Sequence, residues 1–399
     1  MLFYPIKAET HREIKSIIDK IGADPSSLAW FEPKMHTHKL FARGIDYRAA
    51  AFMKQEMLAR GGDVVVHRNV IDGGVKESDI IIVGASGVIR ALLLKMHALD
   101  RWGLKELREE LERALELIYI KSWEYPLSQK RILRLGEKSL IMGILNVTPD
   151  SFYPVSRIGN ETDLISKAAK MLNEGADILD LGAESTRPGA TPVSAEDERR
   201  RIIPAIKALR RVFPVAVISV DTLKPEIALE AAEAGADIIN DVGKSPAMGD
   251  VALETGLPLV VTHSEPINKE NSERLDIVDI VMSNLSDRLD ALRKKGVKNL
   301  IVDPGIGFEK FGSDNMKLIK SISSLRSFGL PILVGHSRKK FLDIEDNGNK
   351  IAPTPEDRLS GTVAVSALLA SSLANVEIIR VHDVLENVRA VRTAEAIST

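Results

Sequence analysis

The stretch Ser139-Leu140-Ile141-Met142-Gly143-Ile144-Leu145-Asn146-Val147-Thr148-Pro149-Asp150-Ser151-Phe152 determines how the rest of the chain is interpreted. Its first half is a continuous apolar run, which is typical of a strand buried on both faces. The run turns polar at Asn146, and Pro149 prevents a simple continuation of the strand. A single polar strand end can be an ordinary solvated turn, so its meaning depends on how the later strands end.

The composition excludes several classes of protein. A chain of 399 residues suggests two domains, and 44% apolar and 28% charged residues are typical of soluble globular proteins. The net charge of −2 gives no general attraction to nucleic acid or to an acidic membrane. The chain has no cysteine, which excludes disulfides, thiolate metal sites and cysteine nucleophiles. There is no secretory signal and no long apolar run, so we expect a cytoplasmic protein with small-molecule substrates and neither nucleic-acid nor membrane partners.

Residues 1–130 predict a smaller α/β domain that precedes the main one. Helical periodicity covers 9–21, 47–60 and 102–120, and short strands are predicted at 63–67 and 79–84. The segment 123–136 contains a proline and mixed charges, and it predicts a linker that leads into the first turn of the second domain. We therefore place the second domain at 131–399.

The second domain alternates strands and helices with short connections. Its predicted strands cover 139–146, 177–182, 216–221, 236–241, 257–263, 300–303, 331–335 and 376–381. Eight strand–helix units in about 265 residues fit a (β/α)8 TIM barrel, whose usual size is about 250 residues. The fold class expected is therefore α/β, with a TIM barrel after a smaller α/β domain.

Every predicted strand ends in polar residues. In order, the ends carry Asn146, Glu184–Gly189, Asp221, Asn240–Asp241, His263, Asp303–Gly305, His336–Lys339 and Arg380–Asp383. In a TIM barrel these ends converge on the face that holds the active site. Each acid or amide could separately be only a helix cap. Eight polar ends on one face are poorly explained by capping alone, so the sequence predicts a site there.

Acids and amides at these ends suit a flat heterocyclic ligand. Asp221, Asn240 and Asp303 supply acceptors for ring N–H and exocyclic NH2 groups, and Lys339 can meet a ring carbonyl or nitrogen. Phe308 either stacks on the ligand or packs in the core, and the sequence does not decide between the two.

The last strands predict an anion site. Arg380 and His382 are two residues apart and point to the same side of a strand, and Ser337 and Arg338 lie on the preceding strand end. TIM barrels often bind phosphate near strands seven and eight, although Arg380 in a solvated salt bridge is the alternative. Asn146 could ligate Mg2+ through its amide oxygen, because one protein oxygen plus waters is an ordinary set of ligands for this ion.

Seven motifs, in this order, resemble those of the dihydropteroate synthase family. They are Asn146–Phe152, Glu184–Gly189, Ser219–Thr222, Ile239–Asp241, Asp303–Phe308, Ser337–Lys339 and Arg380–Asp383. The resemblance covers about 131–399. Residues 54–63 resemble part of an N-terminal extension that some members carry.

The resemblance implies a reaction and a role for each matched residue. Members condense 6-hydroxymethyl-7,8-dihydropterin diphosphate with an arylamine, usually p-aminobenzoate, and release diphosphate. The implied pterin-binding residues are Asp221, Asn240, Asp303 and Lys339. The implied diphosphate-binding residues are Asn146, Arg380 and His382, with Asn146 also on Mg2+. The implied arylamine-binding residues are Thr186, Arg187, Pro188, Phe308 and Ser337. The residues expected to be catalytic are Asp221, Lys339, Arg380 and His382, and we also expect a homodimer.

Two departures from the family pattern leave alternatives open. Tyr153–Ser156 replaces the usual Ser-Asp-Gly-Gly, so a larger, ribosylated aminobenzene is an alternative arylamine. Ser264 replaces the usual Met after His263, which alters one wall of the predicted pterin pocket. The alternative functions are a pterin-binding methyltransferase module that acts with a corrinoid protein, and a non-catalytic pterin-binding homologue.

Overall fold

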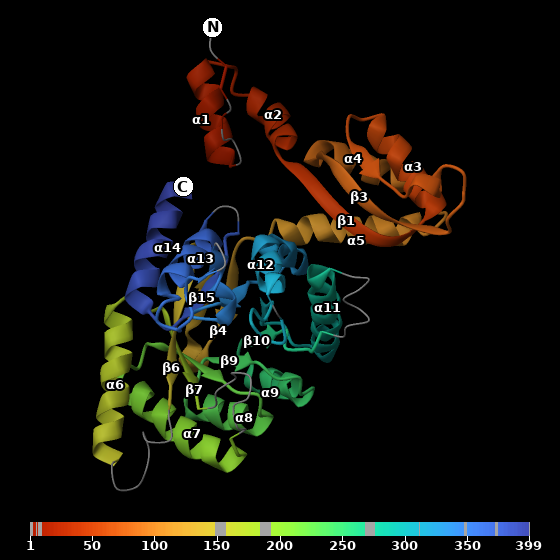
Figure 1. Cartoon of the computed structure of the whole chain (residues 1–399). Helices are drawn as coiled ribbons and strands as arrows, with labels where there is room; N and C mark the ends of the chain where they lie inside the picture. Colours follow the sequence, from red (N-terminus) through yellow and green to blue (C-terminus); the bar gives the residue numbers. More distant parts are fainter. Residues whose placement is uncertain are drawn as a thin grey trace. The chain divides into compact units, whose positions relative to one another are not determined.

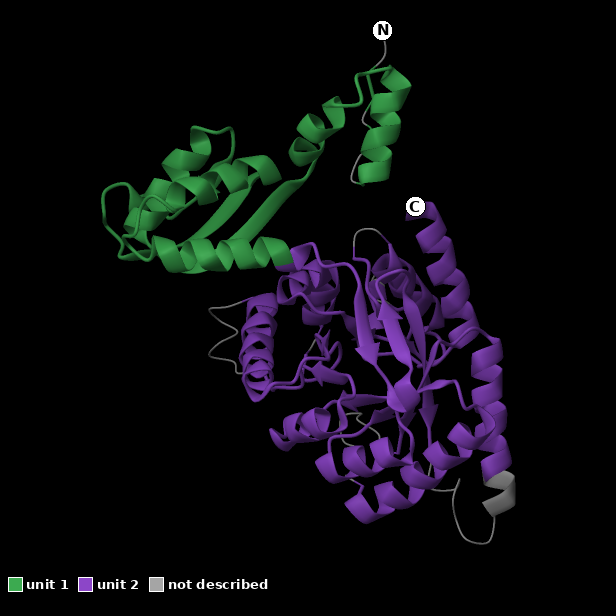
Figure 2. Ribbon diagram, turned by 180° about the vertical axis from the view of Figure 1, so that it is seen from behind, with its two compact units in different colours: residues 1–116 green, residues 117–399 purple. Residues whose placement is uncertain are grey.

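The computed structural model describes residues 3, 4, 6, 10–147, 157–183, 193–267, 276–310, 312–346, 349–371 and 374–398. The chain divides into two compact units, residues 1–116 and 117–399 (Figure 2). Within the described residues, no helix combines the length and apolar character that crossing a membrane requires.

The first unit is a small α/β domain. Its elements are α1 (His11–Ile21), α2 (Ser27–Met35), β1 (Thr37–Asp46), α3 (Tyr47–Leu58), β2 (Asp63–Val65), η1 (Arg68–Val70), β3 (Glu77–Ala85), α4 (Ser86–Met96) and α5 (Leu104–Ile118). The strands form an antiparallel sheet in the order β1-β3-β2. One face of the sheet packs on α3 and α4, which gives this unit a core of its own.

The second unit is the predicted (β/α)8 barrel, which is confirmed. Its strands are β6 (Leu140–Asn146), β7 (Ile178–Gly182), β8 (Val217–Asp221), β9 (Ile238–Asp241), β10 (Leu259–Thr262), β11 (Leu300–Asp303), β12 (Leu333–Gly335) and β15 (Ile378–Val381). They form one parallel sheet in the order β11-β10-β9-β8-β7-β6-β15-β12. A parallel bridge between Val302 and Ile332 joins the two ends of this order and closes the barrel.

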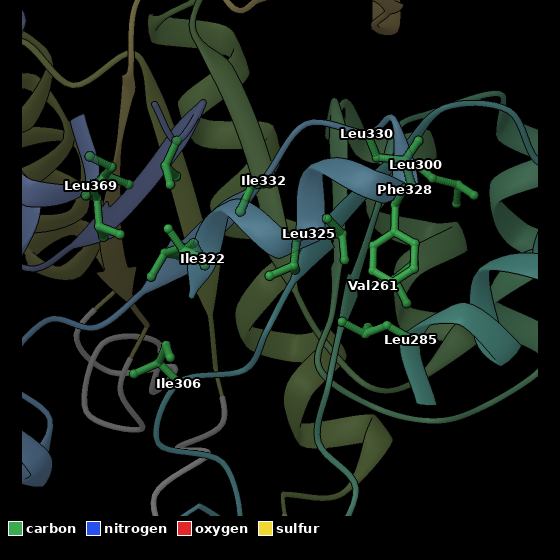
Figure 3. Close-up of a cluster of buried hydrophobic side chains, with 14 of the residues drawn as sticks. Val261, Leu285, Leu300, Ile306, Ile322, Leu325, Phe328, Leu330, Ile332 and Leu369 are labelled. Carbon is green, nitrogen blue, oxygen red and sulfur yellow. The ribbon is translucent and has the colours of Figure 1, made fainter. Parts of the chain in front are cut away.

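Helices alternate with these strands on the outside of the barrel (Figure 1). They are α6 (Arg157–Asn173), α7 (Ala195–Val212), α8 (Pro225–Ala234), α9 (Ala247–Thr255), α11 (Ile277–Lys295), α12 (Ser313–Lys320), α13 (Leu359–Ala370) and α14 (Val384–Ser398). Shorter pieces are η4 (Ile322–Phe328), η5 (Lys340–Leu342) and the hairpin β13 (Glu345–Asp346) with β14 (Asn349–Lys350). Figure 3 shows how the strands and helices meet: Val261 and Leu300 on strands pack with Leu285 of α11 and Leu325 of η4.

The segment predicted as a linker is instead a hairpin of β4 (Trp123–Pro126) and β5 (Ile132–Leu135). Its buried side chains pack against the first inward residues of the barrel strands, such as Ile178 and Ile378. Tyr125 also donates a hydrogen bond to the backbone oxygen of Leu300 at 2.8 Å. The hairpin therefore closes the end of the barrel where the strands begin, and the predicted boundary at 130/131 lies within the second unit.

Candidate active site

The inside of the barrel changes from apolar to polar along the strands. The apolar layer over the hairpin includes Ile178, Ile238, Val260, Ile301 and Ile378. Side chains alternate along a strand, so the residue two positions later faces the same side. Those residues are Asp180, Asn240, Thr262, Asp303 and Arg380. One sequence pattern, an apolar residue followed two positions later by a polar one, therefore builds a polar layer that faces the carboxyl ends of the strands.

Arg380 joins the carboxylates of this layer. Its Nε bonds to Asp180 Oδ2 at 2.5 Å, and its Nη2 bonds to Asp221 Oδ2 at 2.5 Å. Asn240 donates from Nδ2 to the same oxygen of Asp180 at 3.2 Å. Burial by itself would lower the pKa of Arg380, but the two carboxylates outweigh it and raise this pKa. The guanidinium is therefore a permanent positive charge among buried acids.

Asp221 and Lys339 both have perturbed pKa values. Burial raises the pKa of Asp221 to about 7; the charge of Arg380 opposes this rise and that of Asp180 adds to it. Burial lowers the pKa of Lys339 to about 8, and the carboxylate of Asp303 opposes that shift. Burial also raises the pKa of Asp303. Such shifts in neighbouring groups cluster at functional sites.

The turn after β11 brings Lys339 and Phe308 together. Asp303 accepts a hydrogen bond from the backbone N–H of Gly305 at 2.8 Å, which starts the turn. Lys339 donates to the backbone oxygen of Ile306, and its Nζ lies 4.7 Å from the centroid of the Phe308 ring. A cation over a ring face is attracted by the ring quadrupole.

The residues of the predicted anion site lie on the ends of β12 and β15. Buried Ser337 accepts a hydrogen bond from the backbone N–H of His382 at 3.2 Å, and its hydroxyl lies 3.0 Å from Nδ1 of that histidine. Arg338 binds both oxygens of Asp383, at 2.8 and 2.5 Å. Because Arg338 is bonded to this carboxylate, it is less suited to an anion than the sequence suggested.

The structure places the remaining predicted residues as follows. Asn146 is the last residue of β6, is exposed, and pairs in register with Gly182 next to Asp221. Thr186, Arg187 and Pro188 lie outside the described residues.

The chain matches the model of the family described as pterin binding enzyme over residues 142–382. The chain belongs to this family. Dihydropteroate synthase of Escherichia coli is 40% identical over 263 residues, which cover 64% of this chain and 90% of the relative. A solved Xanthomonas albilineans dihydropteroate synthase with 4-aminobenzoic acid is 36% identical, with a TM-score of 0.59, and the match covers 67% of this chain and 96% of that one.

One relative extends the likeness to most of the chain. A probable bifunctional folylpolyglutamate synthase/dihydropteroate synthase of Halobacterium salinarum is 36% identical over 370 residues, which cover 91% of this chain. The likeness to this relative therefore extends into the residues before the barrel. The chain spans 43% of that relative's length.

Sequence reasoning missed two buried charged residues of this barrel. Asp180 is fully buried in the middle of a strand, and an acid in the run Ile178-Leu179-Asp180-Leu181 was the signal that could have revealed it. Lys310 is 5% exposed, and nothing in its local sequence distinguishes it from a surface lysine.

Several buried oxygens of the polar layer have no hydrogen-bond partner within the described chain. They are Asp180 Oδ1, Ser219 Oγ, Asn240 Oδ1 and Thr262 Oγ1. Buried polar atoms are nearly always hydrogen-bonded, and an unpaired one needs an explanation such as a bound ligand or water. These atoms come from four consecutive strands, β7 to β10, so the unsatisfied oxygens gather in one part of the barrel interior.

Proposed function

We propose that this chain is a dihydropteroate synthase, which condenses 6-hydroxymethyl-7,8-dihydropterin diphosphate with an arylamine and releases diphosphate. The observation that carries the proposal is the polar layer itself, in which unpaired acceptors of Asp180 and Asn240 adjoin Asp221 and Arg380. A pterin offers ring N–H and NH2 donors that match acceptors of this kind. The solved relatives named dihydropteroate synthase support the same assignment.

In this proposal the pterin lies over the polar layer. Asp221, Asn240 and Asp303 accept hydrogen bonds from its ring and amino groups, and Lys339 donates to its carbonyl or a ring nitrogen. The hydrogen bond from Lys339 to the backbone oxygen of Ile306 keeps its ammonium beside the turn after β11. Phe308, which lies under that ammonium, borders the ring.

Charge explains how the site would promote the reaction. Negative charge grows on the diphosphate as it leaves, and Arg380 and His382 stabilise it. Positive charge grows on the methylene carbon and spreads into the pterin, where the carboxylates of Asp221 and Asp303 stabilise it. To reach the diphosphate, the Nη2 of Arg380 exchanges its hydrogen bond to Asp221 for one to a diphosphate oxygen, while its Nε stays bonded to Asp180. The arylamine nitrogen then attacks the methylene carbon, so that a C–N bond replaces the C–O bond to diphosphate, and the nitrogen loses one proton to water or to the released diphosphate. No side-chain nucleophile is needed.

Mg2+ belongs to the proposal as an ion held mainly by substrate and water. No cluster of three or more acidic or histidine side chains suited to a metal occurs among the described residues. The exposed amide of Asn146 at the end of β6 fits an ion that takes one protein oxygen and keeps several waters. When bound, the ion would neutralise part of the charge of the diphosphate.

The arylamine is proposed to be p-aminobenzoate, with a ribosylated aminobenzene as the alternative. Within the described residues, Ser337 borders the proposed amine site, and Phe308 borders both this site and the pterin. Thr186, Arg187 and Pro188 are assigned to the amine site from the sequence alone. A homodimer and a cytoplasmic location are further parts of the proposal, and light scattering by the purified chain tests the first of these.

The test of the proposal is a direct assay with Mg2+. Pterin diphosphate and each of a panel of arylamines are mixed with the chain, and both diphosphate release and the coupled product are measured. Release that depends on the amine, with a product of the summed mass, is expected. Pterin binding without release for any amine would instead favour a non-catalytic homologue.

A further inference from the structure

Lys310 is a buried lysine whose partners lie on two different elements. Its Nζ lies 2.9 Å from Nδ1 of His263 and donates to the backbone oxygen of His263 at 3.1 Å. It also donates to the backbone oxygens of Gly305 at 3.0 Å and Phe308 at 2.9 Å. One ammonium group therefore ties the turn after β11 to the end of β10.

These partners are neutral acceptors, and no carboxylate of the described chain lies within ion-pair distance of Lys310. Burial accordingly lowers its pKa to about 7, with the charge of Asp303 opposing the shift and that of Lys339 adding to it. Burial and the charge of Lys310 lower the pKa of His263 to about 3, so this imidazole is neutral. A buried cation is costly unless it is well bonded, which indicates that this position uses the ammonium rather than only the volume of the side chain.

The turn that Lys310 holds carries the pterin half of the proposed site. The turn begins at Asp303 and presents the oxygen of Ile306 to Lys339 and the ring of Phe308 beneath it. The backbone of the turn lies directly on β10, since a Cβ built on Gly305 would come within 1.9 Å of the backbone oxygen of His263. A shift of this turn would displace the contacts of Lys339 and Phe308 together.

The diphosphate half of the site does not depend on this turn. Arg380 and His382 lie on and after β15; Arg380 bonds to Asp180 and Asp221, and His382 contacts Ser337. Within the described chain, Arg380, Asp180, Asp221 and Ser337 form no hydrogen bond or ion pair with Lys310 or with the turn. The two halves can therefore be tested separately.

We propose that Lys310 is a positioning residue for pterin recognition: its ammonium holds residues 305–310 against His263 so that Lys339 and Phe308 meet the pterin. This inference rests on the proposed function. It assigns Lys310 no contact with the substrate and no effect on diphosphate binding.

The absence of cysteine allows the ammonium to be tested apart from the bulk of the side chain. The variant Lys310→Cys is unfolded and alkylated at its single thiol, either with 2-bromoethylamine or with 1-bromopropane, and is then refolded. The first product restores an ammonium at the length of lysine, and the second has a methyl group in its place. Wild-type chain taken through the same steps is the control for refolding, and circular dichroism checks each product.

Two dissociation constants are then measured, for 6-hydroxymethyl-7,8-dihydropterin and for inorganic diphosphate with Mg2+. We expect the propyl form to bind the pterin about tenfold or more weakly, because charge-assisted hydrogen bonds are lost. The aminoethyl form should return to within about threefold of wild type, since it restores them. Binding of inorganic diphosphate should be the same in all forms. Lys317→Met, at an exposed lysine seven residues on that pairs with Asp276, is the matched control.

Three outcomes would overturn the inference. Equal pterin binding by the propyl and aminoethyl forms would show that Lys310 only fills space. Equal losses for pterin and diphosphate, in the propyl form or in Lys310→Met, would show a general structural role. Wild-type chain that binds no pterin would overturn the proposed function as well, whereas normal binding by wild type and the propyl form would overturn only the role of Lys310.

Discussion

Single side chains set the charge of the proposed site, and Asp221 and Lys339 matter most because both titrate near neutrality. Burial raises the pKa of Asp221 to about 7 and lowers that of Lys339 to about 8. Both shifts arise because the barrel interior solvates charge poorly. The charge state of the site therefore changes over a narrow range of pH.

Affinity for the pterin should be greatest near pH 7. Below about 7 Asp221 binds a proton and is no longer an anionic acceptor. Above about 7 Lys310 loses the charge that holds the turn after β11, and above about 8 Lys339 loses its own charge. Fluorescence titration with 6-hydroxymethyl-7,8-dihydropterin measures this affinity between about pH 5.5 and 9.5, a range that extends about 1.5 pH units beyond these values. A flat profile across this range would contradict it.

Asp180→Asn should move the acid limb of that profile to lower pH. The charge of Asp180 helps to raise the pKa of Asp221, so its removal leaves Asp221 ionised at lower pH. The same titration measures the change. The exposed Asp250→Asn, whose side chain pairs with Lys295, is the control and should leave the profile unchanged. An unshifted limb in Asp180→Asn would show that the limb belongs to another group.

At the scale of elements, the turn after β11 and the hairpin β4–β5 act at opposite ends of the barrel. The turn shapes the mouth through Gly305, whose φ of +66° lies in the left-handed region that favours glycine. The hairpin instead closes the other end with apolar side chains. Substitutions in the turn should therefore weaken pterin binding, whereas substitutions in the hairpin should lower the stability of the fold.

Gly305→Ala should abolish most pterin binding. The new Cβ would come within 1.9 Å of the backbone oxygen of His263, so the turn has to move. Gly312→Ala is the matched control, because Gly312 also has a positive φ of +48° but nothing within 4 Å of its Cβ position. Because the ψ of Gly312 is −122°, outside the left-handed helical region, the control should lose about 1–3 kcal/mol of stability but little affinity. Similar binding by both variants, measured by fluorescence, would mean that the turn tolerates displacement.

Leu135→Ala should lower the free energy of unfolding by about 2–5 kcal/mol, the usual cost of a large-to-small change in a core. Leu135 is 1% exposed and belongs to the layer that closes the barrel. Urea unfolding measures the loss, and pterin affinity should not change in the folded protein. Ile132→Ala, at a side chain on the same strand that is 49% exposed, should cost less than 1 kcal/mol. Equal costs would argue that the hairpin is not part of the barrel core.

At the scale of the whole molecule, each unit has a separate hydrophobic core. The core of the first unit draws its buried residues from Ala49–Leu111, and those of the second draw theirs from Tyr125–Val391. The described residues of the proposed site all belong to the second unit. The Escherichia coli relative matches this chain over 90% of its own length but over only 64% of this chain.

Residues 117–399 alone should therefore fold and retain the proposed reaction. We expect kcat/KM within about threefold of the full chain, because a domain with its own core can fold independently. Steady-state diphosphate release by the two chains, compared at equal concentration, measures this. A folded fragment with a much lower kcat/KM would assign a catalytic role to the first unit.

The sequence by itself determined the barrel and the identity of most residues at its mouth. Apolar strands that end in Asn146, Asp221 and Asp303 favour a barrel surrounded by helices. Parallel strands buried on both faces need helices around them, and the barrel brings their polar ends together. The signal is local: it depends on apolar runs that end in polar residues, which are visible residue by residue.

Only the tertiary structure decided which charged groups are paired. The sequence does not reveal that Arg380 bonds to Asp180 and Asp221, because these residues are about 200 and 160 positions away and meet only when the barrel closes. It also gave no sign that Lys310 is buried on His263, or that residues 123–136 form a hairpin beneath the barrel. Burial and pairing depend on what surrounds a side chain in space, and the closed sheet determines those surroundings.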